Sequence, residues 1–508
     1  MASSVVRRIT VFTAAVAAGC SGHVRSPGAA TTLTVLSTAD ERFSSQFYWD
    51  MPEMHAVFLP LATENQQGGL EGRLASHWEH SADSRTWTIH LRPDVRWHDG
   101  VPVTAHDVKF TWDLWTHPAL NGPPPDAAEL TVLDDTTYTF TMRAWAAITP
   151  VSTWNVTYPK HLLEGLDPAK IQEWEFWKQP VGNGPYRYVR HVPKTMTELE
   201  ANPDYYAGRP RIDRLILRYA QPNVTEILSG NVDVMPADWN IALRLGDDPG
   251  LRVISAVAGA WTEVIAWNTR HALFRDPGVR RALTLGINRA ELHGVMNFTR
   301  DLPLYDGPLL PRQVRRGAHP APLPHDPEAA RSLLEAAGWS DRDGDGVREQ
   351  NGMPFRFVLL VGETSPAAVF LQDQYRRLGI QVDIETVSAG IRKRLLAGDF
   401  DAAIQRFVYE TRGGRGLRVF LGDSSVSGFS HPRLPSLFGT METTMDPGAR
   451  EALYAELYDL VREYNPMTVL YPVSDVLVAR TRLQGLPQRP WAGLYTYLPD
   501  LWIKEGAP

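Results

Sequence analysis

The sequence predicts an α/β protein built from several lobes. The chain has 508 residues, which at roughly 150 residues per domain is too long for a single hydrophobic core. Residues 86–115 read as a strand, a tight turn and a helix, and residues 355–408 alternate between strand and helix patterns. Repeated strand-helix-strand units favour a parallel sheet that is covered by helices on both faces.

The composition is that of an ordinary globular chain and argues against nucleic acid as a partner. Hydrophobic residues make up 43% of the chain and charged residues 21%. Because 58 acidic residues outnumber 51 basic ones, the net charge is −7 and the protein has no basic field to attract a phosphate backbone. The chain contains a single cysteine, so neither a disulfide framework nor a thiolate metal cluster is expected.

That cysteine, Cys20, lies at the end of an N-terminal segment with a basic start and a short apolar run. The run is too short to span a bilayer, and small residues precede the thiol, which resembles a bacterial lipobox. We therefore expect residues 1–20 to be a lipoprotein signal peptide, with lipidation at Cys20. Ala17 stands where leucine is usual, so cleavage without lipidation is the alternative. Residues 21–32 are small and polar and are expected to form a flexible tether.

The stretch from residue 86 to 115 is the most informative part of the chain. Three apolar residues alternate with polar ones at its start: Trp87, Ile89 and Leu91. This is the period of a strand with one buried face. Asp99 and Gly100 then form a turn dipeptide, and Thr104 with Asp107 three residues later predicts a capped helix start.

From Trp87 to Trp112, this stretch resembles the signature W-x-x-x-L-R-x-x-V-x-W-x-D-G-x-P-V-T-A-x-D-V-x-F-x-W. It is the signature of the family 5 extracellular solute-binding proteins, the peptide and nickel receptors of ABC importers. The resemblance implies a two-lobed, periplasmic-binding-protein-like fold of type II, cluster C. It also implies a small α+β subdomain inserted in the first lobe, and a location in the periplasm or on the outer face of the cell membrane.

Further family-like segments divide the chain. Residues 183–188 and 202–210 resemble return and turn segments of the first lobe, and residues 263–269 resemble the strand that crosses to the second lobe. The expected division is as follows: residues 33–60, 183–265 and 480–508 form lobe I, residues 61–182 the inserted subdomain, and residues 266–479 lobe II.

Lobe II shows the clearest alternation of strands and helices. Strands are predicted over residues 355–361, 380–387 and 400–408, and helices over residues 366–378 and 391–397. Gly379 and Gly398 follow these two helices directly, as glycines at helix C-termini do. Asp276 and Asp326, each followed by proline, predict two further helix starts. We expect these units to form the parallel, doubly covered sheet.

Two segments of the chain contain residue types that bind metals. Six histidines lie between residues 77 and 117: His77, His80, His90, His98, His106 and His117. We expect His77 and His80 to straddle a turn and His90 to lie on an exposed strand face. Because no cysteine or i,i+4 histidine completes a ligand set, a metal site is not expected there.

Asp341, Asp343 and Asp345 precede a glycine in the manner of a calcium loop. Position twelve of that loop is Gly352 rather than the closing glutamate. A solvated acidic turn is therefore the favoured interpretation, and calcium binding is the weaker alternative.

The best candidate ligand site follows the strand that ends near residue 408. In peptide-binding relatives this segment leads to an aromatic residue and then to an acid that pairs with the amino terminus of the ligand. The resemblance places Phe407 at the aromatic position and Glu410 at the acid. The family text after the acid is replaced here by residues 411–415. As an alternative, Arg406, Arg412 and Arg415 contact a ligand carboxylate or are simply solvated. Family position adds Tyr409, Trp261, Glu263, Asn268, Tyr48 and Trp239 to the candidate site.

The resemblance implies a substrate-binding component that captures its ligand without covalent chemistry. Closure of the two lobes around the ligand would deliver it to ABC permease and ATPase subunits. A peptide or amino-acid-derived solute is the leading ligand class, with an opine, an oligosaccharide or a nickel chelate as alternatives. We expect a monomer without a cofactor. A surface sensor or chaperone is a competing function. A secreted hydrolase is disfavoured because the sequence lacks a nucleophile elbow, a Walker loop, an H-E-x-x-H motif and a Cys/His pair.

Overall fold

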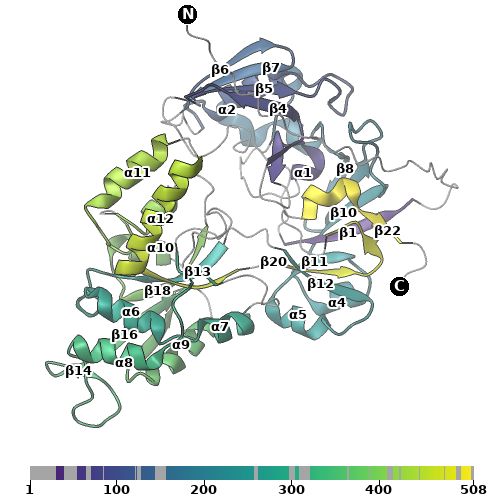
Figure 1. Cartoon of the computed structure of the whole chain (residues 1–508). Helices are drawn as coiled ribbons and strands as arrows, with labels where there is room; N and C mark the ends of the chain where they lie inside the picture. Colours follow the sequence, from purple (N-terminus) through teal and green to yellow (C-terminus); the bar gives the residue numbers. More distant parts are fainter. Residues whose placement is uncertain are drawn as a thin grey trace, which may run out of the picture.

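The structure is a computed structural model of the chain (Figure 1). It describes residues 30–38, 54–64, 70–83, 85–120, 122, 127–142, 156–256, 261–296, 304–307, 321–362, 365–387, 390–408, 416–422, 425–444, 447–473, 475–487 and 494–504. Two large sheets and one smaller sheet organise these residues. The α/β class predicted from the sequence is confirmed.

The largest sheet has seven strands in the order β12-β20-β11-β1-β10-β9-β8. In that order they span Leu251–Ala256, Asp475–Arg480, Val234–Ala237, Thr32–Ser37, Arg214–Tyr219, Met196–Ala201 and Tyr186–Val192. The central strand β1 is parallel to both β10 and β11, and the remaining pairs are antiparallel. Two short helices pack on one face of the sheet, α4 (Val224–Leu228) and α5 (Trp239–Leu245).

The smaller sheet has four antiparallel strands in the order β4-β5-β7-β6. These strands span Ala75–His80, Thr86–Leu91, Thr137–Met142 and Ala127–Asp134. Its inner face buries the alternating residues predicted from the sequence, Trp87, Ile89 and Leu91. Helix α2 (Ala105–Trp115) covers it, and α1 (Met54–Val57) and α3 (Lys160–Leu163) lie nearby. The structure corrects one prediction: His77 and His80 lie on β4 and do not straddle a turn.

Helix α2 begins as the capping signal predicted. The carboxylate of Asp107 accepts a hydrogen bond from the backbone N–H of Thr104 at 2.8 Å, which closes the capping box. Its second oxygen accepts from the backbone N–H of Lys160 at 2.9 Å, at the start of α3. One buried carboxylate therefore holds two helix starts together.

The second large sheet has five strands in the order β17-β16-β18-β13-β19. These span Gln381–Thr386, Arg356–Val361, Ala402–Val408, Trp261–Trp267 and Met467–Pro472. Strands β17, β16 and β18 are parallel, as the repeated units predicted. Strands β13 and β19, whose direction was not predicted, are antiparallel to their neighbours, so the sheet as a whole is mixed. The sequence pattern missed this because β13 and β19 enter from distant segments without a preceding crossover helix.

Helices cover both faces of the five-stranded sheet, in agreement with the prediction. One face packs against α6 (Pro277–Leu285), α7 (Arg289–Met296), α8 (Pro327–Ala336) and α9 (Pro366–Arg376). The other packs against α10 (Ile391–Ala397), α11 (Arg433–Thr443) and α12 (Pro447–Tyr464). The alternation of a strand divides β13 between them, since Ile265 and Trp267 enter the first core and Val264 and Ala266 the second.

Short elements complete the described part of the chain. Three two-stranded ribbons pair β2 (Ala62–Glu64) with β3 (Leu70–Gly72), β14 (Glu349–Gln350) with β15 (Met353–Pro354), and β21 (Leu483–Gln484) with β22 (Trp502–Ile503). The 3₁₀ helices span Pro168–Glu173, Glu175–Lys178, Ala272–Phe274, Gly416–Val419 and Leu494–Asp500.

Two passages of the chain join the large sheets. Strand β12 of the seven-stranded sheet is followed by β13 of the five-stranded sheet, and β19 is followed by β20 in the reverse direction. The chain therefore leaves the seven-stranded sheet after β12 and leaves the five-stranded sheet after β19. The predicted boundaries at residues 265/266 and 479/480 instead fall within β13 and β20. The division into lobe I, inserted subdomain and lobe II stays a prediction.

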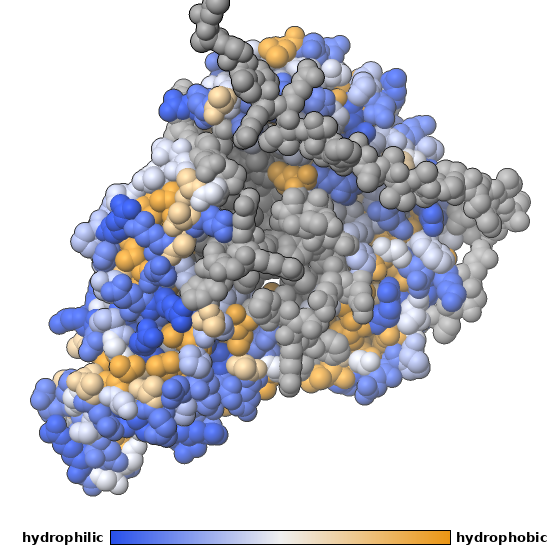
Figure 2. Space-filling view, in the orientation of Figure 1, coloured by the Kyte–Doolittle hydropathy of each residue, from blue (hydrophilic) through white to orange (hydrophobic). Residues whose placement is uncertain are grey.

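The surface is largely hydrophilic. On the face drawn in Figure 2, hydrophobic residues of the described chain form small separate patches between hydrophilic ones. Among the described helices, none has the length and apolar character that a membrane span requires.

Candidate functional site

The edge of the five-stranded sheet at which both passages leave it gathers several of the predicted site residues. Thr262, near the start of β13, lies opposite Phe407 on β18 and Pro472 on β19. The start of β13 and the ends of β18 and β19 therefore meet at one edge. Because the next strand of the chain after β19 belongs to the seven-stranded sheet, this edge lies at the junction of the two sheets.

Three polar side chains form a row across this edge, which we call the junction row: Glu263, Arg406 and Tyr471. Glu263 on β13 lies opposite Arg406 on β18 and opposite Tyr471 on β19. Opposite residues of antiparallel strands project to the same face of a sheet. The junction row thus brings together side chains that are more than 60 residues apart in the sequence.

The contacts within the junction row are unequal. The Tyr471 hydroxyl donates a short hydrogen bond to Oε2 of Glu263. Nε of Arg406 lies 3.9 Å from Oε1 of Glu263, and the side chains of Arg406 and Glu263 are 57% and 14% exposed. Glu263 is therefore largely withdrawn from water, whereas the guanidinium of Arg406 remains well solvated.

The environment of Tyr471 keeps its hydroxyl protonated. Burial raises the pKa of Tyr471 well above its ordinary value, and the negative charge of Glu263 raises it further. A protonated phenol can only donate its one hydrogen, and here it donates to Glu263. Tyr471 was not predicted as a site residue because no sequence pattern reports which residue of a distant strand will face β13.

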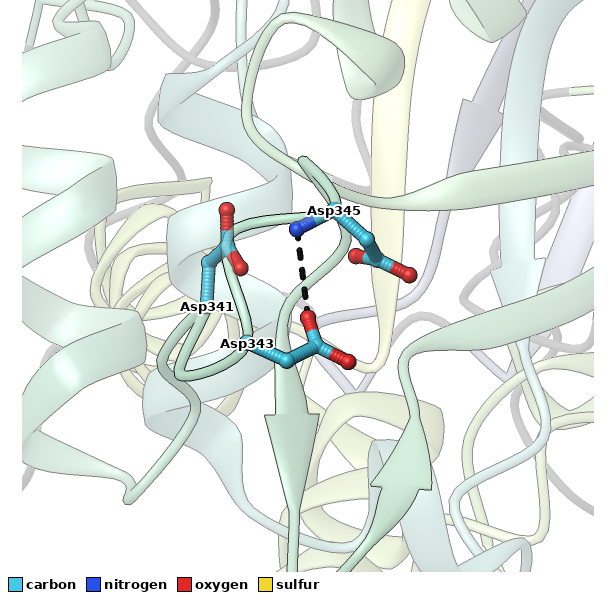
Figure 3. A group of neighbouring side chains, drawn as sticks. All are labelled: Asp341, Asp343 and Asp345. Atoms are coloured by element: carbon cyan, nitrogen blue, oxygen red, sulfur yellow. Dashed lines mark hydrogen bonds between the residues drawn. The ribbon is translucent and has the colours of Figure 1, made fainter.

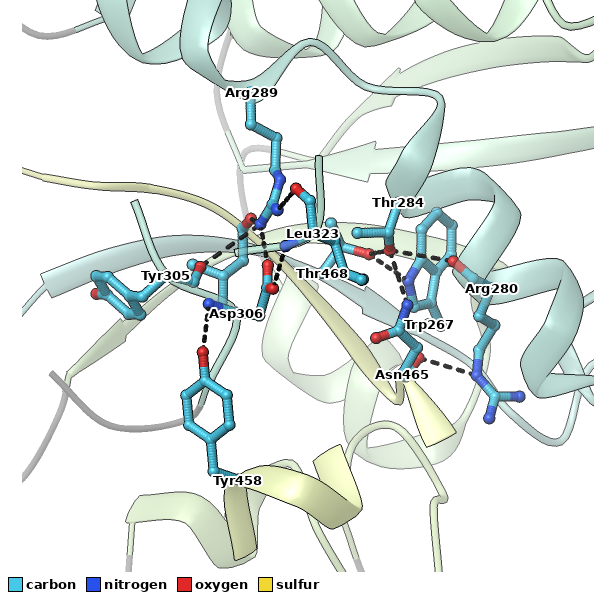
Figure 4. Close-up of polar contacts among 11 residues, drawn as sticks. Trp267, Arg280, Thr284, Arg289, Tyr305, Asp306, Leu323, Tyr458, Asn465 and Thr468 are labelled. Carbon is cyan, nitrogen blue, oxygen red and sulfur yellow. Dashed lines mark hydrogen bonds and ion pairs between the residues drawn. The ribbon is translucent and has the colours of Figure 1, made fainter. Parts of the chain in front are cut away.

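A buried polar network supports the sheet behind the junction row (Figure 4). Arg289 of α7 forms an ion pair with Asp306 at 2.6 Å, and both side chains are 4% exposed. The hydroxyl oxygen of Tyr458 on α12 accepts a hydrogen bond from the backbone N–H of Asp306 at 3.1 Å. Tyr305 reaches the sheet by a hydrogen bond with Thr262. The network thus fixes residues 304–307 to β13 beside the junction row.

A second part of the network in Figure 4 joins β13, α6 and β19. Thr468 accepts a hydrogen bond from the indole N–H of Trp267 at 2.9 Å and lies 2.6 Å from the hydroxyl of Thr284. Asn465 donates its side-chain amide to Thr284 at 3.1 Å. These bonds hold the central strands together at the end of the sheet that is remote from the junction row.

The side chain of Asn268 forms hydrogen bonds with backbone groups. Its side-chain amide donates to the carbonyl oxygens of Gly398 and Phe400 at 3.1 and 2.7 Å, and its Oδ1 accepts from the backbone N–H of Arg270 at 3.2 Å. The side chain is buried. Both ends of the amide contact backbone groups, and the role of Asn268 as a ligand contact stays a prediction.

For each of the remaining predicted site residues, the structure gives either the backbone position alone or no position. Strand positions are known for Trp261, opposite Val408, and for Phe407, opposite Thr262. Trp239 is the first residue of α5, beside the seven-stranded sheet. Five predicted residues lie outside the described residues: Glu410, Tyr409, Arg412, Tyr48 and Cys20.

The acidic loop has the geometry of a turn (Figure 3). Single carboxylate oxygens of Asp341, Asp343 and Asp345 lie within 4.8 Å of one another, and all three residues are exposed. Asp341 accepts the backbone N–H groups of Gly344 and Gly346 at 2.8 and 3.0 Å, and Asp343 accepts that of Asp345 at 3.1 Å. These bonds account for the acidic pattern by local turn formation, so calcium binding stays a weak prediction.

Comparison with known proteins identifies the family. Residues 69–417 match the bacterial extracellular solute-binding proteins, family 5. The chain belongs to this family. Its members are non-enzymatic components of ABC transporters that bind peptides or nickel, so the predicted family and the prediction of a non-enzymatic function are both confirmed.

Relatives of this family 5 protein cover almost its whole length. It is 23% identical to the oligopeptide-binding protein AppA of Bacillus subtilis, over 92% of this chain and 88% of AppA. The structure of that AppA in complex with a nonapeptide superposes with a TM-score of 0.70 at 20% identity, over 93% of this chain and 99% of the other.

A relative with a different ligand matches equally well. The structure of NikZ from Campylobacter jejuni in complex with Ni(L-His) gives a TM-score of 0.72 at 21% identity, over 92% of this chain and 99% of the other. Likeness at this identity establishes the cluster C fold of the family 5 protein but does not distinguish a peptide from a metal chelate.

Proposed function

We propose that this family 5 protein captures a peptide or amino-acid-derived solute between its two lobes and presents it to an ABC permease. The observation that carries the proposal is the position of the junction row, where polar residues of β13, β18 and β19 meet at the edge from which the chain passes to the other sheet. A ligand bound there would contact both lobes, and its binding would favour the closed arrangement.

The proposed ligand-facing residues include those of the junction row and of the segment that follows β18. Glu410 is the proposed partner of a ligand ammonium group, and Phe407, Tyr409 and Arg412 are proposed to line the same region. Ion pairs with a ligand are stronger in a site withdrawn from water, because the opposing charges are desolvated together. Trp261, Trp239 and Tyr48 are proposed as further apolar contacts.

A charged ligand is favoured over a neutral sugar by the chemistry of this edge. Glu263 and Arg406 place one negative and one positive group on the same face of the sheet. A zwitterionic solute offers an opposite charge to each member of that pair, whereas a neutral oligosaccharide offers none.

The test is a thermal-shift screen of the mature protein against peptide, opine, sugar and nickel-chelate libraries. We expect short peptides to raise the melting temperature, and we expect Glu410→Ala to abolish that shift for peptides with a free amino group. Glu385→Gln, on the outer strand β17, is the matched control, since Glu385 bonds to Arg394 away from the junction row. A shift produced by nickel chelates alone would contradict the peptide assignment.

We also propose that the mature protein is tethered to the membrane through a lipid on Cys20. Mass spectrometry of the protein from membranes tests this proposal directly. The expected species starts at Cys20 and carries the mass of a diacylglyceryl group, and Cys20→Ser releases the protein from the membrane fraction. A wild-type protein recovered without that added mass would contradict it.

A further inference from the structure

Glu263 lies where the hydrophobic face of the five-stranded sheet ends. It shares its face of the sheet with Ile265, which is buried in the core under α6 to α9. Arg406 has the same relation to Ile404. Two residues further along each strand, at the junction, the hydrophobic core is thus replaced by a facing acid and base. The pairing of β13 with β19 is also irregular between Glu263 and Val264, and such bulges redirect the side chain next to them.

The two oxygens of Glu263 are satisfied to different degrees. Oε2 accepts the hydrogen bond from Tyr471. Oε1 faces Nε of Arg406 at 3.9 Å, whereas a direct charge-assisted hydrogen bond measures about 2.7–2.9 Å. Among the described residues, Glu263 and Arg406 form an ion pair with each other and with no other residue. Arg406 therefore lies beyond direct hydrogen-bond distance of Oε1.

The exposed fractions of Glu263 and Arg406 favour replacement of Arg406 by a cation of the ligand. With 14% of its side chain exposed, Glu263 has lost most of its hydration, so a cation that contacts it gains more than it would at the surface. Arg406 is 57% exposed, which means that water replaces Glu263 as its partner at little cost when it moves away.

We propose that Oε1 of Glu263 binds an amino or guanidino group of the ligand, which displaces Arg406, while Tyr471 holds the carboxylate in position. This rests on the proposed function and adds to it a second acidic contact besides Glu410. It defines the substrate class as solutes with at least one organic cation, such as peptides with a free amino terminus or a lysine side chain. Tyr471 is a positioning residue, because it acts through Glu263.

Titration calorimetry of the mature protein tests this proposal with a defined probe set: trialanine, the three tripeptides in which one alanine is replaced by lysine, and the fully N-acetylated form of each. We expect wild-type protein to prefer the free over the acetylated form. In Glu263→Gln this preference falls at least about tenfold for one or more peptides, because the amide lacks the charge that the ammonium group recognises. Tyr471→Phe lowers the preference less, since the carboxylate remains but is less well oriented.

The ratio of free to acetylated affinity separates recognition from damage to the fold, because a merely structural defect weakens both forms alike. Glu263→Asp keeps the charge and is expected to keep a preference for the free peptide, and Glu385→Gln serves as the surface control. A wild-type preference that Glu263→Gln leaves unchanged overturns the role of Glu263 but not the proposed function. If no free peptide of the set binds to wild-type protein, the peptide function is wrong and this inference falls with it.

Discussion

At the scale of single residues, His98 shows how burial makes one side chain sensitive to acid. The backbone N–H of Gly182 lies 3.2 Å from Nδ1 of His98, and the carbonyl oxygen of Gly184 lies 3.1 Å from Nε2. A backbone N–H can only donate, so Nδ1 accepts and the hydrogen of the neutral ring is on Nε2. Protonation at Nδ1 would place two hydrogens against each other and break the contact to Gly182.

We therefore predict a loss of stability in weak acid. Burial is the main cause that lowers the pKa of His98 from 6.5 to about 4, with a smaller contribution from Arg187. Between pH 6.5 and 4 the unfolded state binds the proton and the folded state does not, so stability falls as the pH falls through this range. The contribution of His98 is at most about 3 kcal/mol.

Denaturant unfolding at pH 7.0, 5.5 and 4.5 measures this effect. Replacing His98 by glutamine removes the titrating group, so His98→Gln should show a shallower loss of stability between these pH values than wild type. Equal slopes for the two proteins would contradict the assignment of the acid sensitivity to His98.

The ion pair between Arg289 and Asp306 gives a second prediction at this scale. Both side chains are 4% exposed, and Arg289 also donates to the carbonyl oxygens of Leu323 and Val469 at 2.7 and 3.0 Å. Asp306→Ala leaves a buried guanidinium without its counter-ion, and we expect it to cost about 3–5 kcal/mol in the free energy of unfolding. Chemical denaturation measures this loss. The surface pair of Arg356 and Asp383 provides the control, since Asp383→Ala should cost less than about 1 kcal/mol.

At the scale of elements, Asp107 couples the helices α2 and α3. Its carboxylate accepts from the backbone N–H groups of Thr104 and Lys160, at 2.8 and 2.9 Å, and its side chain is buried. We expect Asp107→Ala to lower the stability by about 2–3 kcal/mol, because two backbone donors lose their partner at once. Calorimetric melting tests this. Asp113→Ala on the exposed side of α2 should change the melting temperature little, since Asp113 pairs only with Lys109 at the surface.

The five-stranded sheet shows what element patterns predict and what they miss. Glycines at helix ends, proline after an aspartate cap and the spacing of apolar residues predicted helices that cover this sheet, because each depends on neighbours in sequence. The sequence made no prediction for the direction of β13 and β19. Strand pairing is decided by contacts between segments that are about 140 and 200 residues apart, and the period of two is the same in parallel and antiparallel strands.

At the scale of the whole molecule, the two passages between the sheets predict a closing motion. Small-angle scattering of the mature protein should show a decrease in radius of gyration when a stabilising peptide from the library screen is added, because ligand binding favours the arrangement in which both lobes contact it. The control is the same measurement with an equal concentration of a free sugar in place of the peptide. An unchanged radius of gyration at saturating peptide would contradict closure.

The sequence by itself determined the family, the α/β class and the position of most helices beside the five-stranded sheet, because these follow from a long local signature, from apolar periodicity and from capping residues. Only the tertiary structure decided that Glu263 meets Arg406 and Tyr471. The physical reason is that a side chain acquires its partners from the register of strands that are distant in sequence, and no local pattern encodes that register. The same holds for Asn268, a predicted ligand contact whose amide donates to backbone carbonyls that only folding brings to it.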